Sequence, residues 1–140
     1  MNTPTHLAVN TIIAIPLHYI LGLHTSSTLI FILSGGIFID IDHIFYFAIA
    51  HKTISPRKWI AIAKTMRKKM QPGLYIFHSP ECNALLFVGA FFNKIILIIF
   101  LSNVIHIVLD IVEHYCYYKN FALIKKWSIA YVIFDTIRNR

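Results

Sequence analysis

The chain has 140 residues, a length typical of one domain, and a net charge of +7. Charged residues make up 14% of it and apolar residues 57%, whereas soluble domains carry about 25% charged residues, and no Asp, Glu, Lys or Arg occurs in the first 39 positions. This composition excludes an ordinary cytosolic enzyme, a disordered chain and a secreted disulfide scaffold, and it predicts an all-α fold, a polytopic bundle of membrane helices.

The N-terminal half contains two apolar runs. Residues 7–22 predict a first membrane helix, which is short but spans if its flanks are included, and Gly22 begins the turn that follows it. Residues 28–50 predict a second helix. Its regular geometry is interrupted by the small residues at 34–36 and then by a short polar motif at 40–43.

Residues 51–77 form the one long polar segment. Seven of the 13 Lys and Arg residues lie between Lys52 and Lys69, a stretch without an acidic residue. This clustering beside apolar segments follows the positive-inside rule and places the segment in the cytoplasm. Within it, residues 55–70 predict a basic amphipathic helix on the membrane surface. We therefore expect a multi-pass protein of the cell membrane and no nucleic-acid partner.

The C-terminal half predicts three more helices. Ser79 and Pro80 form a helix start, because Ser caps helices well and Pro suits the first helical position. A third helix is expected over 80–92 and a fourth over 95–118, and a last helix over 125–138 is too short to span a bilayer. The prediction is thus one integral membrane domain, residues 1–140, with four membrane helices, a basic interfacial helix and a short C-terminal helix.

The acidic residues lie in unexpected places. Five of the six fall in or beside the apolar segments, together with several histidines. An ionisable group at membrane depth costs a few kcal/mol unless it has a partner. A bound divalent cation, with zinc the expected ion, is the partner that suits carboxylates and imidazoles together. These acids are Asp40, Asp42, Glu81, Asp110 and Glu113.

Helical geometry brings several of these side chains together. His106 and Asp110 lie about 40° apart on the fourth helix, and Asp40 and His43 about 60° apart on the second. In a regular helix Asp42 points away from the face that Asp40 and His43 share, unless the backbone unwinds near the glycines. An alternative role for Asp42 is that of a carboxylate that orients a histidine ligand. The alternative for His106 and Asp110 is a hydrogen-bonded pair between helices.

The order of these motifs resembles that of a known family. The motifs are Thr5-His6, Asp40-Ile41-Asp42-His43, His78-Ser79 and His106 with Asp110. They are similar to those of the predicted membrane-bound metal-dependent hydrolases of bacteria and archaea, whose ligand pattern is similar to that of zinc phospholipase C enzymes. The chain departs from the family at Ile39, where Pro is usual, and by an apolar residue in place of a second His upstream of His78.

From these residues we expect a membrane-embedded, metal-dependent hydrolase. One or two divalent ions would activate water, and Glu81 or Asp42 would accept the proton. Because the site is expected to open to the cytoplasmic leaflet beside Lys and Arg residues, a phospholipid-like phosphoester is the expected substrate, with the lipid bilayer as partner. The expected metal ligands are His6, Asp40, His43, His78, His106 and Asp110.

Two other functions fit the same pattern. An intramembrane Asp/His site also suits a divalent-metal transporter or sensor, which would need a homodimer to form a path through so few helices. A third possibility is a scaffold in which the polar network only holds helices together. Metal content separates the scaffold from the other two.

Overall fold

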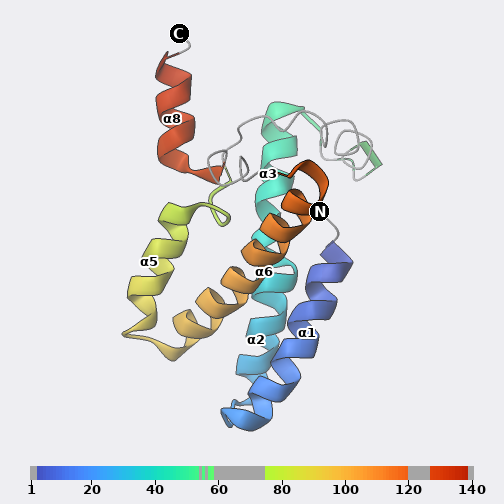
Figure 1. Ribbon diagram of the computed structural model, residues 1–140, viewed down its shortest axis with the longest axis vertical. Helices are drawn as coiled ribbons and strands as arrows, with labels where there is room; N and C mark the ends of the chain where they lie inside the picture. The colour runs from blue at the N-terminus through green and yellow to red at the C-terminus, as the bar shows by residue number, and fades with distance from the viewer. Residues whose placement is uncertain (1–2, 54, 56, 59–74, 120–126, 139–140) are drawn as a thin grey trace.

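The computed structural model describes residues 3–53, 55, 57–58, 75–119 and 127–138 (Figure 1). Within these ranges every regular element is helical, as predicted. The surface helix predicted at 55–70 lies almost entirely outside the described residues. The elements are α1 (Thr3–Ile20), α2 (Thr25–Gly36), the 3₁₀ turn η1 (Phe38–Asp40), α3 (Ile41–Ala50), α5 (Pro80–Ala90), α6 (Lys94–Tyr118) and α8 (Ile129–Arg138).

A tight turn joins α1 and α2 into a hairpin. Gly22 has φ +58°, a left-handed conformation that glycine adopts without a steric penalty. The Leu23 N–H donates to the carbonyl of His18 at 3.0 Å, which closes the turn. The predicted turn at Gly22 is therefore confirmed, and α1 and α2 run side by side (Figure 1).

Helix α2 lies between α1 and α6, and two glycines allow it to approach both closely. A Cβ atom on Gly35 would lie 2.3 Å from Ser102 Oγ and 2.5 Å from the Ser102 carbonyl oxygen in α6. A Cβ atom on Gly36 would lie 2.9 Å from Leu7 Cδ1 in α1. A side chain at position 35 would clash with the backbone of α6, and one at position 36 would be tight against Leu7. The three helices therefore meet around the C-terminal end of α2.

The predicted interruption of the second helix is confirmed and follows directly after these glycines. Helix α2 ends at Gly36, the chain makes the turn η1, and α3 begins at Ile41. The tighter winding of a 3₁₀ turn rotates the following side chains relative to a continuous α-helix. Asp42, expected to point elsewhere in a regular helix, is only 2% exposed as a result.

Helices α5 and α6 form a second hairpin whose starts agree with the prediction. The Ser79 side chain accepts a hydrogen bond from the Cys82 N–H at 3.0 Å, and Pro80 occupies the first turn of α5. The Asn93 side chain caps α6 by accepting from the Ile95 N–H at 2.8 Å. These caps satisfy backbone donors that a helix start leaves without an intrahelical partner.

Two helical stretches of the described chain are long and apolar enough to cross a membrane, rather than the predicted four. They are Thr25–Tyr46 and Lys94–Cys116. Helix α5 has 11 residues, whereas about 20 are needed to cross the hydrocarbon core. Polar side chains such as His6 and Asn10 interrupt the apolar sequence of α1.

The interior of the described structure is more polar than its surface. Ten polar or charged residues are buried, against five apolar ones. Large apolar side chains face outward on every long helix, for example Tyr19 at 78%, Leu85 at 75% and Ile137 at 69% exposed. This distribution is the reverse of that in a water-soluble protein, which exposes only small apolar patches.

Candidate metal centre

The polar interior is centred on six side chains that come from distant parts of the sequence. Two groups of three each have potential ligand atoms within 4.8 Å of one another. The first group joins α1 to α6, and the second joins η1 and α3 to the residue that precedes the Ser79 cap. The groups are His6, His106 and Asp110, and Asp40, His43 and His78.

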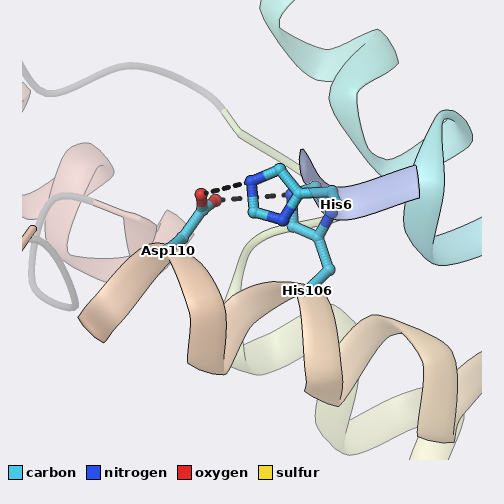
Figure 2. Close-up of side chains that lie close together, drawn as sticks. All are labelled: His6, His106 and Asp110. Carbon is cyan, nitrogen blue, oxygen red and sulfur yellow. Dashed lines mark ion pairs between the residues drawn. The ribbon is translucent and has the colours of Figure 1, made fainter. Parts of the chain in front are cut away.

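Asp110 lies at the middle of the cluster. Its Oδ1 atom is 3.0 Å from His6 Nε2, and its Oδ2 atom is 3.4 Å from His106 Nε2 and 3.5 Å from His78 Nε2. Figure 2 shows the His6 and His106 rings stacked beside each other, with both facing the Asp110 carboxylate. One carboxylate of α6 therefore contacts imidazoles from three segments.

Asp40 and His43 complete the cluster and form its accessible side. Asp40 Oδ1 lies 3.6 Å from His106 Nε2 and 3.7 Å from His43 Nε2. The side chains of Asp40 and His43 are 12% and 23% exposed, whereas those of His6, His78, His106 and Asp110 are at most 3% exposed. The cluster is thus uncovered on the side of η1 and α3.

The spacing of these atoms fits a metal ion. Zinc with ligands at 2.0–2.1 Å in a tetrahedron separates neighbouring ligand atoms by about 3.3–3.5 Å. The contacts that link Asp110 Oδ2, His106 Nε2, His78 Nε2 and Asp40 Oδ1 measure 3.4, 3.5 and 3.6 Å. Three of the six separations among these four atoms are therefore close to those expected within one zinc coordination shell.

Hydrogen bonding gives a second indication of the same kind. Within the described part of the chain, the Nε2 atoms of His43, His78 and His106 and both oxygens of Asp110 are buried and make no hydrogen bond of normal geometry. Buried polar atoms without a hydrogen bond are rare because desolvation is costly. A cation among these atoms would offset that cost.

Two of the imidazoles are held in the orientation that metal binding requires. The Nδ1–H group of His106 donates to the Gly35 carbonyl oxygen. The Nδ1–H group of His78 donates to Asp42 Oδ2 at 3.3 Å. In both rings the Nε2 lone pair is thereby directed into the cluster, as in carboxylate–histidine–metal and carbonyl–histidine–metal arrangements.

The structure places Asp42 behind His78 instead of among the atoms that face the cluster. Its Oδ2 atom also accepts from the backbone N–H groups of Phe77 at 2.6 Å and His78 at 3.2 Å. With three donors on one oxygen, Asp42 orients the segment before α5. This geometry fits the sequence-based alternative of an orienting carboxylate and does not fit the expected role as proton acceptor.

Replacing Asp42 with alanine should weaken metal binding without removing a ligand. Loss of such an orienting partner typically costs about 10–100-fold in metal affinity, because the His78 ring is then free to rotate. The zinc dissociation constant of the purified protein, measured by competition with a chelating dye, tests this. Asp135→Ala in α8 is the matched control, and equal affinity in both variants would contradict the orienting role.

The two carboxylates that contact His78 also control its protonation. Burial lowers the pKa of His78, but the carboxylates of Asp110 and Asp42 outweigh it and raise that pKa to about 9. These carboxylates therefore favour a positive charge on this ring. A divalent cation satisfies the same carboxylates and takes the place of that proton.

A polar network supports the cluster from the side away from α3. The Ser102 hydroxyl donates to the Phe31 carbonyl oxygen and lies 3.1 Å from Asn10 Oδ1. The Asn10 amide in turn donates to the His6 carbonyl at 3.0 Å. Since Asn10 and Ser102 are fully buried, these bonds fix α1 relative to α2 and α6 and hold His6 in position.

Glu81, expected as a proton acceptor at the metal site, instead caps the C-terminal helix. Its carboxylate accepts from Ser128 Oγ at 2.6 Å and from the N–H groups of Ile129 and Ala130, both at 3.2 Å. Those groups are the donors that the start of α8 leaves unpaired. Sequence spacing does not reveal this contact between α5 and α8, and the role expected for Glu81 stays a prediction.

This cap should make docking of α8 sensitive to acid. Partial burial opposes ionisation of Glu81, but the hydrogen bonds from Ser128 and the α8 backbone outweigh it and lower the pKa from 4.5 to about 2. The stabilisation is thus complete above about pH 4.5 and is lost as the pH falls toward 2. Emission of the buried Trp127, isolated by Trp59→Phe, should shift to the red over this range.

The control for acid sensitivity is Glu81→Gln in the same Trp59→Phe background. This variant should show a smaller change between pH 4.5 and 2 than its parent, because position 81 no longer titrates. The same red shift in both proteins would assign the transition to other carboxylates.

Trp127 is a contact of the cluster that the sequence did not indicate. Its side chain is 3% exposed, and its ring lies 5.1 Å from the His78 ring. A single tryptophan at the start of the expected last helix carries no periodic or motif signal of such a contact. Together with the Glu81 cap, it brings the start of the C-terminal segment against the cluster.

No protein-family model matches the chain, and no curated protein or solved structure does either. The function proposed next is therefore argued from the geometry of the cluster and from the polarity of the structure.

Proposed function

We propose that this chain is an integral membrane protein that binds divalent metal and hydrolyses a phosphoester in a lipid-like substrate. The observation that carries the proposal is the convergence of buried imidazole and carboxylate atoms, without hydrogen bonds, at metal-ligand spacing. Carboxylate and imidazole together are a ligand set for zinc, manganese or iron, and zinc is the ion that we favour.

The polarity of the protein supports the membrane part of the proposal. The stretches Thr25–Tyr46 and Lys94–Cys116 are apolar and long enough to span, and the described surface exposes many large apolar side chains. Such an apolar surface is stable in contact with lipid. Polar residues at that depth then need partners within the protein interior. We place the protein in the cell membrane with its basic segments in the cytoplasm.

The ligands that would hold an ion are His78, His106, Asp40 and Asp110, with His6 close by. A divalent ion bound by them would polarise the phosphoryl group and acidify a water molecule at neutral pH. The protein supplies the orientation of the ligands through Gly35 and Asp42. Burial of His78, His106 and Asp110 keeps bulk water away and strengthens the electrostatic interactions.

In this proposal His43 is the group that takes up the proton. It is the most exposed of the cluster imidazoles, and its Nε2 atom lies 3.7 Å from Asp40 Oδ1. A histidine at the accessible edge, beside the Asp40 carboxylate, is placed to receive a proton from water at Nε2. This assigns to His43 the role that the sequence suggested for Glu81 or Asp42.

The substrate class follows from the surroundings of the accessible side. Basic side chains follow α3 directly, and Lys52, Arg57 and Lys58 are exposed. Basic residues beside a membrane attract anionic lipid headgroups. A phosphoester at the headgroup of a lipid satisfies both the basic surroundings and the apolar surface, and the resemblance to membrane-bound metal-dependent hydrolases agrees with this class.

The test uses the detergent-purified chain with bis(p-nitrophenyl) phosphate and with vesicles of an anionic phospholipid, in zinc or manganese. We expect hydrolysis that EDTA abolishes and that is lost in His106→Ala. His18→Ala is the matched control, since His18 lies in α1 but bonds Thr28 at 2.9 Å, outside the cluster.

Two results would overturn the proposal. The first is a purified protein that binds no zinc and whose melting temperature does not change when zinc is added. That result would leave only a structural role for the cluster. Bound zinc without turnover, accompanied by metal flux into proteoliposomes, would instead identify a transporter.

A further inference from the structure

The stacking of His6 and His106 bears on how many ions the centre holds. The two ring centroids are 3.9 Å apart, and the ring planes are inclined by 22° (Figure 2). A metal bound to an imidazole lies close to the ring plane, because the nitrogen lone pair lies in that plane. It also lies about 2.0–2.1 Å from the nitrogen.

One ion bound to both rings would lie well out of the plane of at least one of them. Planes with this separation and inclination intersect only about 9–10 Å from the rings, several times the length of a metal–nitrogen bond. The two Nε2 lone pairs are therefore directed at two separate positions. Near-parallel rings separated by 3.9 Å place those positions about as far apart as the 3.5–4 Å between the metals of two-metal sites.

The Asp110 carboxylate has the matching geometry. Oδ1 faces His6 Nε2 at 3.0 Å, and Oδ2 faces His106 Nε2 at 3.4 Å. Figure 2 shows these two contacts running side by side from separate rings to the carboxylate. A carboxylate that presents one oxygen to each of two imidazoles is suited to bridge two cations.

Resting on the proposed function, we infer that the centre binds two divalent ions bridged by Asp110, and that the two sites differ in strength. The first site has four donors, His106, His78, Asp40 and Asp110 Oδ2. The second has His6 and Asp110 Oδ1. With only two of these donors, the second site leaves coordination positions for oxygen ligands of a phosphoryl group, which two-metal sites bind between their ions.

The experiment measures zinc bound per chain after equilibrium dialysis of the detergent-purified protein. We expect two ions in the natural chain, one in His6→Ala, and two in the control His18→Ala. The first ion should bind at least about tenfold more tightly than the second, because it has more protein ligands. His6→Asn is a second variant that keeps a polar side chain in case alanine disturbs α1.

Electron paramagnetic resonance of the manganese-loaded protein gives an independent readout. Two Mn²⁺ ions bridged by a carboxylate give an exchange-coupled spectrum, and His6→Ala should give the six-line spectrum of isolated Mn²⁺. One zinc per chain with an uncoupled spectrum would overturn the two-ion inference while leaving a metalloprotein. Binding of no metal would overturn the proposed function itself.

Discussion

Replacing Asp110 with alanine should abolish metal binding, and this is the largest single effect that we expect. Asp110 contacts His6, His78 and His106 through its two oxygens. Loss of a merely orienting partner costs about 10–100-fold in metal affinity, so loss of a central ligand should raise the zinc dissociation constant more than about 100-fold. Isothermal titration of the detergent-purified protein measures this.

The isosteric variant Asp110→Asn keeps the result interpretable if alanine impairs folding. Asparagine preserves the size of the side chain but removes its charge, so zinc binding should remain severely weakened while the helical circular dichroism is retained. Asp135→Ala in α8 should bind zinc like the natural protein. Zinc binding by Asp110→Asn at natural affinity would show that the cluster is not centred on this carboxylate.

Replacing Gly35 with alanine should both destabilise the protein and weaken the metal centre. The added Cβ atom would lie 2.5 Å from the Ser102 carbonyl oxygen and 2.9 Å from its carbonyl carbon. Because these are backbone atoms, α2 and α6 have to separate, and overpacking of this kind costs about 1–3 kcal/mol. The Gly35 carbonyl, which orients His106, moves with the helix. Thermal unfolding and zinc affinity measure the two effects.

Gly89→Ala is the matched control, since it adds the same methyl group between α5 and α6. There the new Cβ atom meets only the Ile96 side chain, at 3.1 and 3.3 Å, and small movements of that side chain relieve the contact. We expect a much smaller change in melting temperature and no change in zinc affinity. Equal effects of the two substitutions would contradict the close approach of α2 to α6.

The local features of the fold were predictable because short-range chemistry determines them. Ser79 and Asn93 cap helices through their own side chains. Gly22 adopts a left-handed conformation, which glycine reaches without a steric penalty whatever its neighbours. The structure has two stretches that are long and apolar enough to span a membrane within its described residues, against the four predicted. Helix α5 ends at Ala90, too soon to cross a bilayer.

For the candidate site, the residues that come together were easier to predict than the role of each carboxylate. The pair His106 and Asp110 lies on one helical face at the spacing of four residues, and the structure brings that pair together with His6, His78 and Asp40. The roles of individual carboxylates depended on contacts distant in sequence. Asp42, which follows η1, accepts hydrogen bonds from the backbone N–H groups of Phe77 and His78. Glu81 accepts a hydrogen bond from Ser128 at the start of α8.

The contact between His6 and Asp110 has a consequence for biosynthesis. His6 emerges from the ribosome well before Asp110. The contact that joins α1 to α6 is therefore incomplete until α6 has been synthesised. A metal ion held by this pair, as proposed above, would bind only after that point, and a cell starved of the ion would accumulate a precursor whose α1 is not yet fixed to α6.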